Sequence, residues 1–133
     1  MSQKSYAVFV AVLSLFLGAI PVLAHHSISS EFDPDKEWTV TAVLTKIDWV
    51  NPHIVTRFSV TDPKSGQAEE WMCEGNPPAT LRRAGMVKTD WKLGETVSIT
   101  CAAAKDGTRN WGFLKMIKYK SDGHVLVFRI GGE

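Results

Sequence analysis

Turn-forming residues divide the chain between positions 37 and 130 into short segments in which apolar and polar side chains alternate. This period of two is typical of β-strands, and the segments are rich in Val, Ile, Thr and Trp, which favour strands. The breaks between them contain Asn-Pro, Pro-Lys-Ser-Gly and Lys-Asp-Gly, which favour tight turns. The predicted strands are Glu37–Val50, Ile54–Val60, Ala68–Glu74, Thr96–Ala103, Trp111–Lys120 and Val125–Ile130. The pattern therefore predicts a mainly β domain.

The alternation changes phase within the first predicted strand. The first set of alternating residues is Trp38, Val40, Ala42 and Leu44, and the second is Val43, Thr45, Ile47 and Trp49. A phase change inside a long strand indicates a β-bulge, which bends the strand so that it can serve both sides of a barrel.

One segment carries helix signals instead. Pro77–Ala84 follows Asn76, a suitable N-cap, and precedes Gly85, a suitable C-terminal residue. Three strands, one short helix and then further strands is the order of a small OB-like Greek-key barrel, in which strand five lies between strands three and four. A two-sheet sandwich made from the same strands is the alternative. The residues predicted to face the interior are Val40, Leu44, Ile47, Phe58, Val60, Trp71, Val97, Ile99 and Ile117.

The first 24 residues have the layout of a secretory signal peptide. Lys4 precedes the apolar segment Ala7–Ile20, Pro21 breaks the helix, and Val22-Leu23-Ala24 provides a cleavage site. The apolar run is shorter than the ~20 residues that span a bilayer, although an uncleaved anchor is the alternative. We therefore expect a signal peptide at 1–24, an extended N-terminal arm at 25–36 and a barrel domain at 37–133.

Removal of the leader leaves a formally neutral chain. Lys4 is the only charge in the leader, so 14 basic residues remain against 14 acidic ones. Nucleic-acid binding depends on an excess of Lys and Arg that neutralises phosphates, and this chain has none. We expect no nucleic-acid partner and no stable membrane span after cleavage.

The two cysteines give conflicting signals. Export to an oxidising compartment favours a disulfide between Cys73 and Cys101. In the OB-like order, however, their strands are not neighbours and lie about twice 4.8 Å apart, which exceeds the ~7 Å Cα limit for a bridge. We therefore expect two buried thiols, and a bridge across the barrel interior is the alternative.

Several motifs together resemble a known bacterial family. They are AHHS at the mature start, WVNPH at the first hairpin, CEGNPPATLRRAG through the helix and AAAKDG at a later turn. The chain is similar to short exported proteins that are classed as a domain of unknown function. The resemblance covers nearly the whole mature chain, and it implies a periplasmic or secreted bacterial protein with a small β-barrel and no established activity.

The mature chain start is the strongest candidate for chemistry. If cleavage exposes His25, its α-amine and its imidazole Nδ1 can chelate one metal ion, and a third nitrogen would complete the T-shaped site called a histidine brace. His26 offers a competing mode through the amine, the intervening amide and its own imidazole. Such nitrogen-rich sites favour Cu(II), and an α-amine with a pKa of about 7.7–8.0 releases its proton readily. A solvated arm without a metal is the alternative.

His53 and His124 are the other two imidazoles, each at a predicted turn or strand end. Either can supply the third nitrogen. For His53, which follows Asn51-Pro52, a hydrogen bond to the turn backbone is the alternative role.

Two further pairs of residues are candidates for ligand binding. Trp49 and Trp111 flank turns and are the best candidates among the five tryptophans for a surface that stacks an aromatic or sugar ligand. Packing in the core and at the rim is the alternative. Arg82 and Arg83 are adjacent on the predicted helix and do not share a face. One can pair with a glutamate of the third strand while the other binds an anion.

No common nucleophile motif and no glycine-rich phosphate loop occurs in the sequence. Glu74 follows Cys73, but the sequence predicts no base beside them. We therefore expect a non-catalytic binding or accessory protein that engages a periplasmic protein or a small ligand. The alternative is a copper-binding or copper-handling protein that uses the mature chain start.

Overall fold

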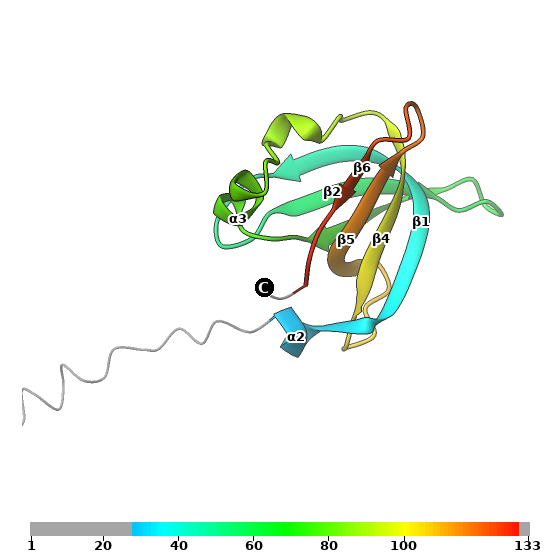
Figure 1. The fold of residues 1–133 in the computed structure, drawn as a ribbon. Coiled ribbons are helices and arrows are strands. Elements are labelled where there is room, and N and C mark those ends of the chain that lie inside the picture. Colours follow the sequence, from blue (N-terminus) through cyan, green and yellow to red (C-terminus); the bar gives the residue numbers. More distant parts are fainter. Residues whose placement is uncertain (1–27, 131–133) are drawn as a thin grey trace, which may run out of the picture.

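The computed structural model describes residues 28–130, and it has the mainly β architecture that the sequence predicts (Figure 1). Its helical elements are α2 (Ile28–Glu31), α3 (Pro78–Arg83) and the short 3-10 helix η1 (Lys88–Asp90). Its strands are β1 (Phe32–Asp48), β2 (Val55–Thr61), β3 (Ala68–Glu74), β4 (Thr96–Ala104), β5 (Trp111–Tyr119) and β6 (Val125–Val127). The predicted leader, His25 and His26 lie outside the described residues. Within residues 28–130, no helix is both long and apolar enough to cross a membrane.

The strands form one sheet that closes into a barrel. Their order is β3-β2-β1-β4-β5-β6 with antiparallel neighbours, and β3 also pairs in parallel with β5. β5 therefore lies between β3 and β4, which is the OB-like order. β6 pairs with a later part of β5, at Met116–Lys118. Because a single sheet closes on itself, the structure excludes the two-sheet sandwich.

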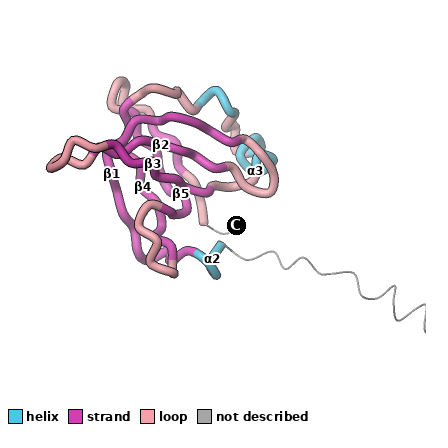
Figure 2. The backbone as a smooth tube through the Cα atoms, turned by 180° about the vertical axis from the view of Figure 1, so that it is seen from behind, coloured by secondary structure: helices cyan, strands magenta, loops and turns pink. Residues whose placement is uncertain are grey.

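The two ends of the barrel differ (Figure 2). The hairpin between β2 and β3 projects at one end, whereas the loop between β1 and β2 lies beside α3 at the other. We call the second end the α3 end.

The predicted bulge in β1 is confirmed. β1 pairs with both β2 and β4, and its register against β2 shifts between Leu44 and Lys46. Leu44 and Ile47 are consequently both buried although they lie three positions apart. The bulge lets one long strand contribute to both sides of the barrel.

The predicted extended arm is wrong for its described part. Ile28–Glu31 is helical, and β1 begins at Phe32 rather than at Glu37. Phe32 is buried, and its ring lies 5.7 Å from that of Phe113. Burial of this aromatic side chain ties the segment to the barrel, and a second register shift between Asp33 and Glu37 accommodates the intervening residues.

Most of the predicted core is buried. Seven of the predicted residues are buried, namely Leu44, Ile47, Phe58, Trp71, Val97, Ile99 and Ile117. Val40 and Val60 are half-buried and pack against the same cluster. A smaller cluster of Phe32, Ala102, Ala104 and Phe113 lies apart from it, with Ile28, Trp111 and Ile130 packed against it.

The predicted helix is present but shorter. It spans Pro78–Arg83, and Gly85 follows it with a left-handed φ of 82°, as expected of a glycine at a helix end. Asn76 is not the N-cap. Its side-chain amide instead donates to the carbonyl of Arg129 (3.0 Å) and links the start of the helical segment to the end of the chain.

The expected pair of free thiols is wrong, because Cys73 and Cys101 form a disulfide with their Cα atoms 6.7 Å apart. The intervening strand β5 has Gly112 at the register position of Cys73. A Cβ on Gly112 would lie 2.9 Å from that of Cys101 and 2.6 Å from the carbonyl oxygen of Ala102. Because glycine leaves this space empty, β3 and β4 can be bridged across the interior while the OB-like strand order is kept.

Candidate functional site

The β1–β2 loop and the segment after β3 meet at the α3 end of the barrel, and this contact forms the candidate site. The amide of Gly75 donates to the carbonyl of Ile54 (2.9 Å). A Cβ at position 75 would lie 2.8 Å from Cγ1 of Ile54, so the close approach requires glycine. The preceding residues of the two segments, His53 and Glu74, are thereby brought together.

The imidazole of His53 has two acceptors on one side. Its Nδ1 lies 3.0 Å from the carbonyl oxygen of Gly75 and 3.3 Å from Oε1 of Glu74. A carbonyl oxygen only accepts hydrogen bonds, so Nδ1 carries the proton. In the neutral ring, Nε2 then has a free lone pair. None of the hydrogen bonds among residues 28–130 uses this nitrogen.

Glu74 is a largely buried carboxylate. Its side chain is 18% exposed, and that of His53 is 23% exposed. Burial raises the pKa of the Glu74 carboxyl, the positive charge of His53 lowers it, and the negative charge of Glu31 raises it. Glu31 is the last residue of α2, whose Ile28 packs against the cluster that contains Phe113, the residue that pairs with Glu74 in the sheet.

Such an arrangement prepares a histidine to bind a ligand. Histidines that ligate metals donate their other ring N–H to a carboxylate or a backbone carbonyl, which fixes the ring and makes the ligating nitrogen more basic. His53 has both kinds of acceptor at Nδ1. Its Nε2 can therefore coordinate a metal ion or accept a hydrogen bond from a ligand.

His124 does not join this site. It is exposed in the turn between β5 and β6, and its ring stacks on that of Tyr119 with the centroids 6.1 Å apart. This turn and the β1–β2 loop lie on opposite sides of the barrel (Figure 1). Within residues 28–130 there is no group of three or more His, Cys, Asp and Glu side chains that could hold a metal ion. The two described histidines among the predicted ligands are thus separate.

The two predicted stacking residues also lie in different places. Trp49 is half-buried, and its ring meets that of Trp91 edge to face with the centroids 5.4 Å apart. Trp111 is half-buried, and its ring centroid lies 6.0 Å from that of Phe32. Both rings therefore make packing contacts, and ligand stacking by either one stays a prediction.

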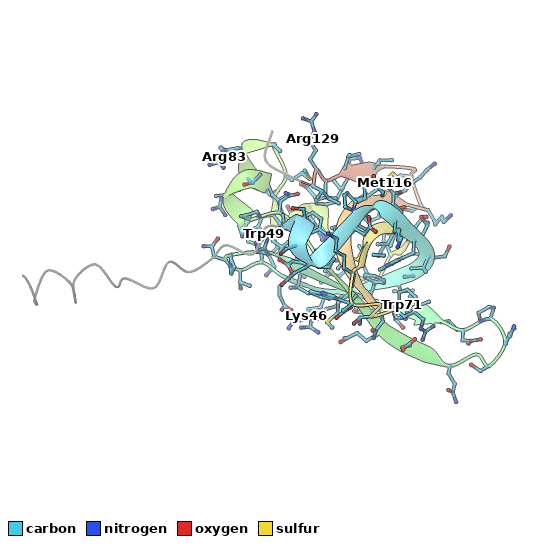
Figure 3. All side chains as sticks on the ribbon, turned by 90° about the horizontal axis from the view of Figure 1, so that it is seen from below. Lys46, Trp49, Trp71, Arg83, Met116 and Arg129 are labelled. Carbon is cyan, nitrogen blue, oxygen red and sulfur yellow. A yellow bond between two sulfur atoms is a disulfide. The ribbon has the colours of Figure 1, made fainter. Side chains whose placement is uncertain are left out.

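Arg82 and Arg83 are exposed on α3, and Arg83 extends away from the barrel (Figure 3). The ion pair expected with a glutamate of β3 is absent from the described residues. Those glutamates have other partners: Glu69 pairs with Arg109, Glu70 with Arg57 and Glu74 with His53. The two arginines are thus open to solvent, and anion binding by them stays a prediction.

Glu74 is the site residue that sequence reasoning missed. The sequence places it beside Cys73 and predicts no base nearby, whereas the fold supplies His53 as its partner. One signal was available in the two Asn-Pro pairs, Asn51-Pro52 and Asn76-Pro77, since each directly adjoins one side of this contact. Cys73 itself is in the disulfide and has no free thiol.

Comparison with known proteins gives a family but no activity. The family model described as "Family of unknown function (DUF6152)" matches residues 12–113 of this chain. No curated protein and no solved structure matches the chain.

Proposed function

Since the chain belongs to the DUF6152 family, whose function is unknown, we propose a function from the site itself. We infer that the protein is an exported, non-catalytic binding or accessory module of the bacterial periplasm that captures a small ligand or a protein at the α3 end of its barrel. One observation carries this proposal: the Nδ1 of His53 is held by Gly75 and Glu74, and its Nε2 is left for a ligand.

Two features support export. The first 24 residues have the charge and hydropathy layout of a cleaved leader. The Cys73–Cys101 disulfide is the second feature, since disulfides persist in the periplasm and other oxidising compartments and are rare in the cytosol.

Binding is favoured over catalysis by the chemistry beside the imidazole. A nucleophilic mechanism needs a hydroxyl or thiol next to a base. The thiol closest in sequence to Glu74 is that of Cys73, and the disulfide removes it. The two groups that contact Nδ1 of His53 are acceptors, which orient a ring but do not attack a substrate.

Nuclear magnetic resonance tests this proposal. The mature protein is screened against small carboxylic acids, sugars, aromatic compounds and divalent cations, and binding is mapped onto the backbone amides. We expect a ligand to shift residues 51–54 and 74–76 together, and His53→Ala to abolish the shifts. His124→Ala is the matched control and should leave them unchanged. A ligand that binds elsewhere with these two segments unperturbed would contradict the proposal.

Copper binding at the chain start is the second candidate function. Cleavage after Ala24 would give His25 a free α-amine beside its imidazole, and such a pair favours Cu(II). A specific observation supports a cation here. The described residues begin with α2, which follows His25 closely in sequence and carries the carboxylate of Glu31. A carboxylate this near the chain start in the sequence favours a bound cation.

Calorimetric titration of the mature protein with Cu(II) tests this second function. We expect tight binding of one ion, and we expect its loss when one glycine is added before His25 or when His25 is replaced by alanine. Weak binding that these changes do not affect would rule out a site built on the chain start.

A further inference from the structure

We propose that the free edge of β6, at Val125 and Val127, is a docking surface for an extended segment of another protein that is acidic at both ends and apolar at alternate positions between them. The partner would pair with β6 through its backbone and so add a strand to the sheet. This surface does not include His53, so the inference goes beyond the proposed function and does not depend on it.

The backbone groups of Val125 and Val127 point away from the strand that pairs with β6. β6 pairs with β5 and with no other described strand. On either side of β6, the carbonyl of His124 accepts from β5 and the amide of Phe128 donates to it, each at 2.9 Å. Successive residues of an antiparallel strand direct their backbone groups to opposite edges. The N–H and C=O groups of the two valines, at alternate positions between these bonds, therefore point to the edge that has no strand beside it.

The end of the same edge gives independent evidence of this direction. Arg129 is two positions after Val127, and its carbonyl accepts from the side-chain amide of Asn76 at 3.0 Å. Asn76 lies just before α3, so this edge of β6 faces the α3 side of the barrel (Figure 1). The contact with Asn76 covers the edge at Arg129. Within residues 28–130, by contrast, no hydrogen bond uses the backbone groups that Val125 and Val127 direct to this edge.

The side chains beside the free edge are apolar and exposed. Val127 is 60% exposed, the largest fraction among the large apolar side chains of the described residues, and Val125 is 39% exposed. Met116 lies opposite Val127 on β5 and is half-buried. Natural proteins normally protect an edge strand from pairing, so exposed valines on such an edge indicate a surface that a partner covers. Residues of an added strand that bond to the two valines would share their face of the sheet, and these partner residues should be apolar.

The charges around the edge select an acidic partner. The exposed basic residues that make no ion pair within residues 28–130 are Lys118, Lys120 and Arg129. The acidic side chains nearby are already engaged: Asp122 pairs with Lys92, Glu37 pairs with Lys115, and Glu95 accepts from Ser121. Lys118 lies opposite Val125, and Arg129 extends away from the barrel at the other end of the edge (Figure 3). Acidic side chains at both ends of the partner segment complement these charges.

A second copy of this chain fits the edge less well than an acidic partner. Antiparallel pairing of two β6 edges would bring the unpaired basic side chains of both copies together, and like charges repel. The proposal therefore commits to a different protein, and self-association becomes an outcome of the test.

Amide hydrogen exchange followed by nuclear magnetic resonance tests the inference on the mature protein. The probe is a blocked seven-residue peptide with glutamate at both ends, valine at the third and fifth positions and threonine elsewhere, added at millimolar concentration. We expect the amides of Val125 and Val127 to exchange about tenfold more slowly or less when the peptide is present, because they then donate to it. The amide of Phe128 already donates to β5 and is the internal control.

Two variants separate the backbone pairing from the charge. Val127→Pro removes an N–H on the free edge without removing a bond to β5, and it should abolish peptide binding. Val127→Thr keeps this N–H and is the matched control that should still bind. Arg129→Glu keeps the backbone contact with Asn76 and should weaken binding about fivefold or more, because it replaces an attraction by a repulsion. Melting curves show whether each variant is folded, and Arg129→Glu keeps the test decisive if proline prevents folding.

Three results would overturn the inference. The first is exchange of Val125 and Val127 that the peptide does not slow. The second is equal binding of a peptide with lysine in place of both glutamates, since charge would then not select the partner. The third is slow exchange of these two amides without peptide that increases with protein concentration, which would assign the edge to a second copy of the chain.

Discussion

The carboxyl group of Glu74 is held where ionisation is unfavourable. Burial is the main reason, and the negative charge of Glu31 adds to it, while His53 opposes both. Folding therefore favours the protonated form of this group. Its contribution to stability is most favourable at low pH and is lost as the pH rises through the raised pKa.

The change Glu74→Gln should consequently stabilise the protein at pH values above the raised pKa, where the wild-type carboxylate is ionised. The gain should shrink as the pH falls through the raised pKa and be gone below the ordinary range of a glutamate, because the wild-type side chain is then neutral as well. Urea unfolding at several pH values measures this difference. Glu70→Gln, at an exposed site on the same strand, is the control. A stability difference for Glu74→Gln that stays constant across this pH range would contradict the account.

Ile99 tests the phase of the fourth strand. Its side chain is fully buried in the main core. Replacement by alanine removes buried methylene groups and leaves a cavity, so Ile99→Ala should lower the free energy of unfolding by about 2–5 kcal/mol. Ser98→Ala, at the neighbouring half-buried position, is the control. A loss of less than about 0.5 kcal/mol for Ile99→Ala is typical of a surface residue and would show that the strand faces the other way.

At the scale of elements, β5 is the strand that closes the barrel and pairs with three others. It pairs with β4 along most of its length, with β3 at its start and with β6 near its end. Gly112 leaves room for the disulfide between the two flanking strands. A single position without a side chain thus allows barrel closure and a covalent crosslink together.

The change Gly112→Ala should lower the free energy of unfolding by about 1–3 kcal/mol, the usual cost of overpacking. The added methyl would meet a backbone oxygen, that of Ala102, which cannot move without disturbing the sheet. Thermal unfolding followed by circular dichroism measures the effect. Alanine also lowers the backbone entropy of the unfolded chain, which by itself would stabilise the protein. A net stabilisation by Gly112→Ala would therefore refute the tight packing between β3 and β4.

Local sequence patterns predicted the helices and strands well, whereas features that depend on contacts between distant residues were not predicted. The bulge in β1 and the helix before Gly85 are both encoded by neighbouring residues, so alternation and turn chemistry were sufficient. The early start of β1 at Phe32 was missed because it depends on packing against Phe113, far along the chain. The same reason applies to the His53–Glu74 contact, which exists only because the barrel brings two loops together.

At the scale of the whole molecule, the disulfide links β3 and β4, two strands that do not pair with each other. Cys73 and Cys101 are separated by 28 positions in the sequence and lie on strands that are not neighbours. Crosslinks of this kind typically stabilise a small domain by about 2–4 kcal/mol. Average strand spacing predicts that the two cysteines lie too far apart for a bridge, but Gly112 permits a closer approach across the interior.

If the proposed export is right, the protein recovered from the periplasm should carry both the cleaved start and the bridge. Expressed with its own leader and recovered from the periplasm, it should have the mass of residues 25–133 less two hydrogens. It should take up no alkyl group when denatured without reduction, and two after reduction. A mass that includes residues before His25, or two alkyl groups without reduction, would contradict the export or the disulfide respectively.

The proposed binding function rests on the claim that Nε2 of His53 is free because Nδ1 holds the proton. The most direct measurement is the long-range proton–nitrogen correlation spectrum of the His53 imidazole in the folded protein, at a pH where the ring is neutral. The account predicts a protonated Nδ1 that donates to Gly75 and an unprotonated Nε2. A spectrum that shows the proton on Nε2 would contradict it, because the nitrogen assigned to the ligand would then have no lone pair to offer.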